Sequence, residues 1–262
     1  MDGSERPGAE PDPVETDATP EEPTEKRAGA GRRPSTRILA LGVAAAVLLA
    51  GGAVAWAATK PDEKGPAKGR FSALPDLCAA VPGSTLRQYL PRAGTPVPDR
   101  PETNSSGERS GGCEWTEPTY EVGAKRLTAR SAQVSARIFP NVTAAEEDYD
   151  HSWRSAKTTA GTASSSLGDI HAEAPSIVGG VGDEAFAQPQ QVADKFGRSA
   201  NVTTTVRLSN AVLVVTYEGA TYGTDENGAI DLSRATPLDE SVSRAAAQTI
   251  AQNVVTAFVL HG

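Results

Sequence analysis

Hydrophobic residues are spread unevenly along the chain, and their pattern divides it into four segments. Residues 1–37 are rich in Pro, Glu, Asp, Gly and Thr and have almost no large apolar side chains. We predict a disordered tail there, because so little burial cannot offset the entropy of ordering. Residues 38–58 are apolar throughout, residues 59–70 are polar like a linker, and residues 71–262 carry the apolar periodicities of a folded domain.

The apolar segment, residues 38–58, has 21 residues and no charge. As a helix it would be about 32 Å long, which matches a hydrocarbon core of about 30 Å. Residues 26–37, just before it, contain five basic residues and no acid, and the end richer in Lys and Arg stays in the cytoplasm. We therefore predict a single-pass membrane protein with a cytoplasmic N-terminus and an extracellular C-terminal domain.

A cleaved signal peptide is the alternative interpretation of this segment. Ala55-Trp56-Ala57 fits the small-x-small pattern of a cleavage site, and Arg32-Arg33 resembles a twin-arginine signal. The apolar run is longer than the usual signal core of about 7–15 residues, which favours a retained anchor. Both interpretations place residues 71–262 outside the cytoplasm.

Within residues 71–262 the pattern predicts helices and strands in the order α-β-β-α-β-β-β-α, in which the first α stands for one or two short helical turns. Residues 91–111 and 158–168 are rich in Pro, Ser, Thr and Gly and are predicted to be surface loops. Residues 211–217 are almost continuously apolar, which indicates a central strand covered on both faces. Ser209-Asn210 before them predicts a hairpin turn. We expect an α+β domain, with an antiparallel sheet and helices packed mainly on one face.

The predicted strand 126–139 changes the parity of its apolar positions. Leu127 and Ala129 fall at odd positions, whereas the apolar residues of Val134–Ile138 fall at even positions. Because a strand alternates its faces residue by residue, one extra residue near Ser131-Ala132 would restore a single register. We therefore expect a bulge there.

Two helices have recognisable starts. Thr143 and Glu146 fit a capping box, and Thr236 followed by Pro237 fits the start of the last helix. The last helix should bury an apolar stripe against the central strand 211–217. That stripe comprises Val242, Ile250, Val254 and Phe258.

The only cysteines are Cys78 and Cys113. In an oxidising compartment an isolated pair is best interpreted as a disulfide, and closing a loop of this length stabilises by roughly 4 kcal/mol. A redox or metal pair is the alternative, but the pair lacks CxxC spacing and a nearby His. We predict a Cys78–Cys113 disulfide.

Short motifs surround these cysteines. The run 76–78 (Asp-Leu-Cys), a Pro/Ser loop, 113–115 (Cys-Glu-Trp) and 181–186 (Val-Gly-Asp-Glu-Ala-Phe) resemble a family of secreted actinobacterial lipoproteins defined as a domain of unknown function, over residues 71–262. The resemblance implies a cell-envelope location and no established activity. The chain departs from the family because no lipid-attachment Cys follows residues 38–58.

Candidate chemistry is sparse. From Arg70 onward there are 22 acids and 16 bases with no basic face, which argues against nucleic acid as a partner. The histidines, His151, His171 and His261, have no Gly-x-Ser-x-Gly or HExxH motif beside them. The acidic run 146–150 fits a solvated helix start, and 225–231 lacks the first and last ligands of a calcium loop. We assign no catalytic, metal-binding or cofactor-binding residue.

These observations predict a membrane-anchored, non-catalytic domain of the cell envelope that binds a small ligand or another envelope protein. Two alternatives stay open. One is a single-pass signalling protein whose tail has a cytoplasmic partner, and the other is an unrecognised envelope enzyme.

Overall fold

The computed structural model describes residues 67–119, 123–166, 168–194, 197–225, 227 and 230–261. They belong to one compact unit, Lys60–Gly262. The predicted tail (1–37), transmembrane helix (38–58) and most of the linker lie outside the described residues. Within the described part, no helix has the length and apolarity that a membrane crossing requires.

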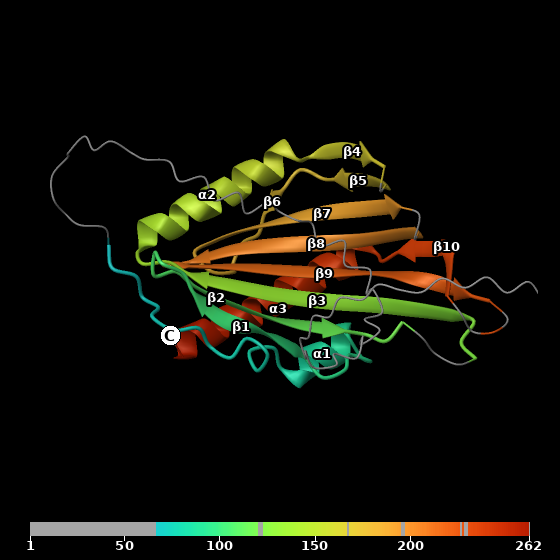
Figure 1. Cartoon of the computed structure of the whole chain (residues 1–262), viewed down its shortest axis with the longest axis horizontal. Coiled ribbons are helices and arrows are strands. Elements are labelled where there is room, and N and C mark those ends of the chain that lie inside the picture. The colour runs from blue at the N-terminus through green and yellow to red at the C-terminus, as the bar shows by residue number, and fades with distance from the viewer. Residues whose placement is uncertain are drawn as a thin grey trace, which may run out of the picture. The chain divides into compact units, whose positions relative to one another are not determined.

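The described residues form helices and strands of one antiparallel sheet (Figure 1). In chain order they are α1 (Gly83–Tyr89), β1 (Val97–Thr103), β2 (Arg109–Thr116), β3 (Arg126–Ile138), α2 (Val142–Thr158), β4 (Gly161–Ser165), β5 (Gly168–Ala172), β6 (Ser176–Ile177), β7 (Glu184–Asp194), β8 (Gly197–Leu208), β9 (Ala211–Thr224), β10 (Ile230–Pro237) and α3 (Glu240–His261). The strand order is β1-β2-β3-β9-β8-β7-β5-β4, with β10 on β9 and β6 on β7. The predicted α+β class with an antiparallel sheet is confirmed.

Helices α1 and α3 cover one face of the sheet, which we call the α3 face. Its core contains Phe258, which is fully buried and meets Phe71 edge-on with ring centroids 5.2 Å apart. Ile250 and Val254 are also fully buried, as predicted. Val242 is not: it is 48% exposed, because the buried stripe of α3 instead begins at Ser243.

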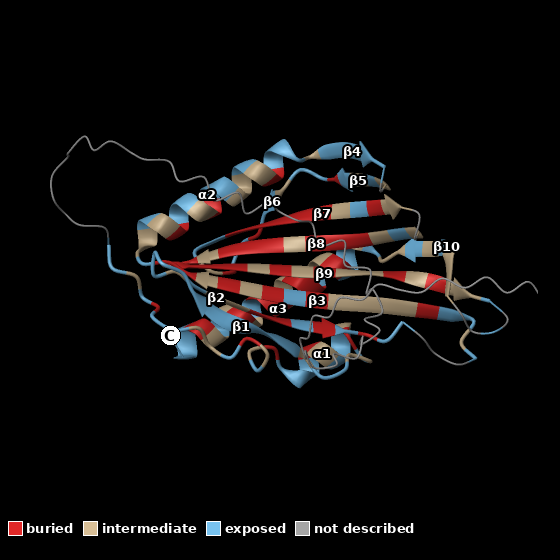
Figure 2. Cartoon of the chain, in the orientation of Figure 1, coloured by how far each residue is buried: buried red, intermediate tan, exposed pale blue. Residues whose placement is uncertain are grey.

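Helix α2 lies on the opposite face, the α2 face, so the helices do not all share one side. Its Tyr149 and Trp153 pack edge-on against Phe186 of β7, with centroids 5.5 and 5.1 Å apart. Val212 of β9 belongs to the same smaller cluster. Strand β9 is therefore covered on both faces, as its continuous apolar run predicted. Figure 2 shows the buried residues along the central strands and exposed residues along the edge strands β1 and β4.

Two predicted loops contain strands. Residues 91–111 include β1 and the start of β2, and residues 158–168 include β4. Both β1 and β4 are sheet edges exposed along their whole length. A strand with no buried face has no apolar alternation to detect, and an edge tolerates prolines such as Pro98 and Pro101.

The bulge predicted near Ser131-Ala132 is wrong. Strand β3 pairs with β2 and with β9 in unbroken register. The parity switch instead reflects burial on both faces, since Leu127 is buried at one end of β3 on the α2 face, and Val134 is buried farther along on the α3 face.

Both helix starts differ from the predicted caps. The Asn141 side chain, not Thr143, caps α2 by accepting from Ala144 N at 2.9 Å. Helix α3 starts at Glu240 after Asp239, whose Oδ1 accepts from the first-turn N–H groups, while Pro237 belongs to β10. An oxygen-bearing side chain just before each helix satisfies the donors that the helix leaves free.

The predicted hairpin at Ser209-Asn210 joins β8 to β9, and Ser209 has φ 53°. Asn210 is buried, and its amide links three segments. Its Oδ1 accepts from Phe71 N at 2.9 Å, and its Nδ2 donates to the carbonyls of Phe71 and Phe139 at 2.9 and 2.8 Å. This turn therefore fixes the start of the folded unit to the end of β3.

Candidate functional site

Cys78 and Cys113 form the disulfide predicted from the sequence, with Cα atoms 5.3 Å apart. It joins the segment before α1 to β2, beside the fully buried Trp115. The bond is part of the α3-face core.

The 182–186 motif builds the start of β7. Gly182 has φ 65°, and its Cα approaches the backbone of Arg207 so closely that a side chain would collide. Asp183 and Glu184 then meet the Arg207 guanidinium at 3.6 and 2.9 Å, and Phe186 packs under α2. The motif that carries the family resemblance thus has a structural role, as has Cys113 in the other motif.

The three histidines are not brought together. His151 and His261 are exposed on helices, and His171 lies on β5, where its Nδ1 is 2.9 Å from Thr162 Oγ1. Among the described residues, no group of three or more His, Cys, Asp or Glu side chains is arranged to hold a metal ion.

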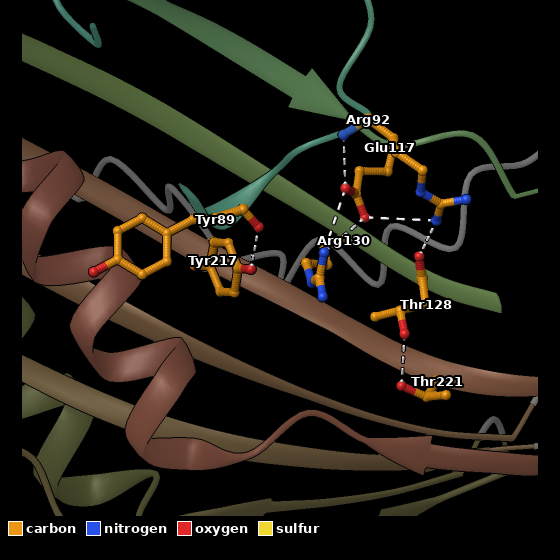
Figure 3. A network of polar contacts seen from close by, with 7 residues as sticks. All are labelled: Tyr89, Arg92, Glu117, Thr128, Arg130, Tyr217 and Thr221. Carbon is orange, nitrogen blue, oxygen red and sulfur yellow. Dashed lines mark hydrogen bonds and ion pairs between the residues drawn. The ribbon is translucent and has the colours of Figure 1, made fainter. Parts of the chain in front are cut away.

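The structure reveals a cluster of charges around Glu117, which directly follows β2 (Figure 3). The Glu117 side chain is 0% exposed and lies between two arginines that are 31% and 27% exposed, Arg92 and Arg130. Arg92 N donates to Oε1 at 3.1 Å, and Arg130 Nη1 lies 3.4 and 3.5 Å from the two carboxylate oxygens. Arg92 Nη2 also donates to the carbonyl of Thr128.

Two tyrosines adjoin this cluster on the α3 face. Tyr217 OH donates to the carbonyl of Tyr89 at 2.8 Å, and Tyr89 OH lies 3.3 Å from Thr249 Oγ1 of α3. Burial raises the pKa of Tyr217 to about 12, against the smaller lowering effect of Arg130. Tyr217 therefore stays a neutral hydrogen-bond donor at physiological pH.

The contacts of the Glu117 cluster hold neighbouring segments of the chain together rather than leaving its carboxylate free for chemistry. Both carboxylate oxygens already face guanidinium groups, so Glu117 is poorly placed to exchange a proton with a ligand. The contacts tie the α1–β1 connection (Arg92) to β2 and β3. Strand alternation could have revealed this position, because Glu117 falls on the same face as Cys113 and Trp115; its partners could not be identified that way.

A cavity of about 80 Å³ lies on the α3 face between β5, β7, β8 and the start of α3. We call it the β5–α3 cavity. The strand pairs His171–Gln191 and Gln191–Ala200 form one row across it. Its remaining lining comes from Glu173, Pro189, Val202, Leu238, Glu240, Ser243 and the neighbouring strand residues Gln190 and Asn201. The last two belong by strand alternation to the opposite face.

The lining of the cavity combines apolar, neutral polar and acidic residues. Pro189, Val202 and Leu238 are apolar, whereas Glu173 and Glu240 bring carboxylates. No sequence motif marks this site, because its residues come from four separate elements. It can be identified only after the sheet and α3 are assembled.

No family model and no curated protein matches the chain. Two solved structures from Mycobacterium tuberculosis are similar to it. The extracellular domain of PknH has a TM-score of 0.47 and 12% identity, over 74% of this chain and all of that one. LpqN, involved in cell envelope biogenesis, has a TM-score of 0.23 and 15% identity, over 62% of this chain and 81% of that one. Similarity this low carries no functional argument.

Proposed function

We propose that residues 71–262 form a non-catalytic binding domain outside the cytoplasm, anchored to the cell membrane by residues 38–58. The observation that carries the proposal is the Cys78–Cys113 disulfide. Such bonds persist in oxidising compartments and are rare in the cytosol. The five bases before residue 38 support the same orientation.

Binding, rather than catalysis, is the role that the site supports best. The Glu117 carboxylate is enclosed by arginines, which suits cohesion more than proton transfer. The β5–α3 cavity is a concave surface with apolar walls and a few polar groups, which is the usual character of a small-ligand site. An envelope protein that inserts a side chain there is an equally suitable partner.

Thiol labelling of the full chain in intact cells tests the location. Ser105→Cys, in the exposed β1–β2 turn, should react with a membrane-impermeant maleimide. Pro20→Cys should react only after the cells are permeabilised. Labelling of position 20 in intact cells would reverse the proposed orientation. A mature N-terminus at residue 58 would show that the apolar segment is a cleaved signal instead of an anchor.

A further inference from the structure

We propose that the β5–α3 cavity binds an alkylammonium group, with its unbranched aliphatic chain inside the cavity and its ammonium at the carboxylates of Glu173 and Glu240. This inference rests on the binding role proposed above and gives the ligand's chemical class.

The size of the cavity limits the ligand. At about 80 Å³ it has roughly half the volume of the engineered cavity of about 150 Å³ that holds benzene. The enclosed part therefore holds only a few carbon atoms, such as a short unbranched chain. Pro189, Val202 and Leu238 give this chain apolar walls, and burying methylene groups against such walls is favourable.

The charges at the cavity favour a cation. The Glu173 carboxylate has no ion pair or hydrogen bond within the described part of the chain. Glu240 is paired with Arg244 at 2.7 Å, and the same guanidinium donates to the neutral Ser176 Oγ at 2.9 Å. The two carboxylates in the lining therefore have one guanidinium between them, and Glu173 is the one that it does not pair with.

The start of α3 does not reverse this preference. A free helix N-terminus attracts anions. Here the Asp239 carboxylate already accepts from Ser241 N and Val242 N at 2.9 and 3.2 Å, and it adds another negative charge. The remaining titratable group, His171, contacts Thr162 through Nδ1.

An alkylammonium could be a lysine side chain of a partner protein or a free amine. The two share an aliphatic chain that ends in NH₃⁺. They differ in what must pass the rim: a free amine enters whole, whereas a lysine stays attached to a peptide backbone outside. The exposed side chains of His171, Glu173 and Gln191 leave the rim open to solvent.

Three probes of equal chain length separate charge from shape. The ¹⁵N-labelled full chain in maltoside micelles is titrated at neutral pH and constant ionic strength with n-butylammonium, n-butanol or butyrate. The amide signals of Gln191 and Ser243 report on binding. We expect saturable shifts with n-butylammonium at a millimolar Kd, binding of n-butanol at least about threefold weaker, and no saturable shift with butyrate. Equal binding of the three, or none with n-butylammonium, would overturn the proposal.

Glu173→Gln should weaken n-butylammonium binding about three- to fivefold, the usual worth of one exposed charge pair. The matched control is Glu102→Gln, an exposed acid on the opposite edge strand β1, which should leave the Kd unchanged. An equal loss in both variants would mean that overall charge, not this site, attracts the cation.

N-acetyl-lysine N-methylamide distinguishes the two sources. Binding comparable to n-butylammonium indicates a protein-borne lysine, and loss of binding indicates a free amine. The thiol-labelling result is independent of these titrations. If n-butylammonium does not bind but the labelling pattern is as expected, the ligand class is wrong and the location stands. If n-butylammonium binds but the labelling pattern is reversed, the location is wrong and the ligand class stands.

Discussion

The two faces of the sheet hold their helices in different ways. On the α3 face, α1 and α3 lie over a continuous apolar core, and its charge cluster has one fully buried acid, Glu117, between two arginines. On the α2 face, one helix covers a small aromatic cluster, and the composition of the charge cluster is inverted. There Arg207 is 13% exposed among three acids that are each about half exposed, namely Glu146, Asp183 and Glu184.

From this contrast we expect the Glu117 cluster and the Arg207 cluster to contribute differently to the stability of the domain. The ion pairs of a fully buried carboxylate are less hydrated and less screened by salt than exposed pairs, so losing that charge is costly. Half-exposed carboxylates can be hydrated again when their partner is removed, so their ion pairs are worth little and are screened. The α3 face should therefore be the rigid part of the domain.

The largest effect should come from the apolar core of the α3 face. Phe258→Ala empties a fully buried aromatic site against Phe71 and should lower the free energy of unfolding by about 3–5 kcal/mol. Gln252→Ala, on the exposed side of the same helix, should change it by under about 0.5 kcal/mol. Urea denaturation followed by Trp fluorescence measures both. Equal midpoints would mean that α3 is peripheral and that its apolar stripe is a surface for a partner.

Glu117→Gln should have the next largest effect, a loss of about 2–3 kcal/mol. The amide keeps the shape of the side chain but removes the buried negative charge that faces the guanidinium groups of Arg92 and Arg130. Their partial exposure allows some hydration, which holds the loss below that for Phe258. Glu114→Gln, at an exposed position on the preceding strand β2, serves as the control. If the two variants have the same urea midpoint, the buried Glu117 cluster does not stabilise the domain.

The elements that bury a face were predictable from the sequence. The central strand, the stripe through Ile250 and Phe258, and the disulfide follow from strand or helix periodicity and from an isolated Cys pair. Strands β1 and β4 were missed because their side chains face solvent throughout. A bulge was wrongly predicted in β3 because the buried apolar residues of this strand change face along its length.

The sites could not be predicted in the same way, because each is assembled from distant residues. Glu117 meets Arg92 from 25 positions earlier and Arg130 from 13 positions later. The β5–α3 cavity needs Glu173 of the β5 side and Glu240 of α3 on one face of a finished sheet. Local sequence propensity contains no information about contacts between residues that lie so far apart in the chain.

The smallest effect, and the sharpest test of the contrast, is expected at Arg207. Arg207→Met keeps most of the aliphatic stem and removes the charge. Glu146, Asp183 and Glu184 lose their cation, but each is half exposed and can be hydrated. The loss should be about 1 kcal/mol at low salt and should nearly vanish near 1 M salt, where the screening length is about 3 Å.

The Glu117→Gln loss should persist at the same salt, because water and ions do not reach the buried Glu117 carboxylate. Urea denaturation of both variants at the two salt concentrations decides the matter. An Arg207→Met loss as large as that of Glu117→Gln and insensitive to salt would show that both clusters stabilise the domain alike, and the two faces would then differ only in their apolar packing.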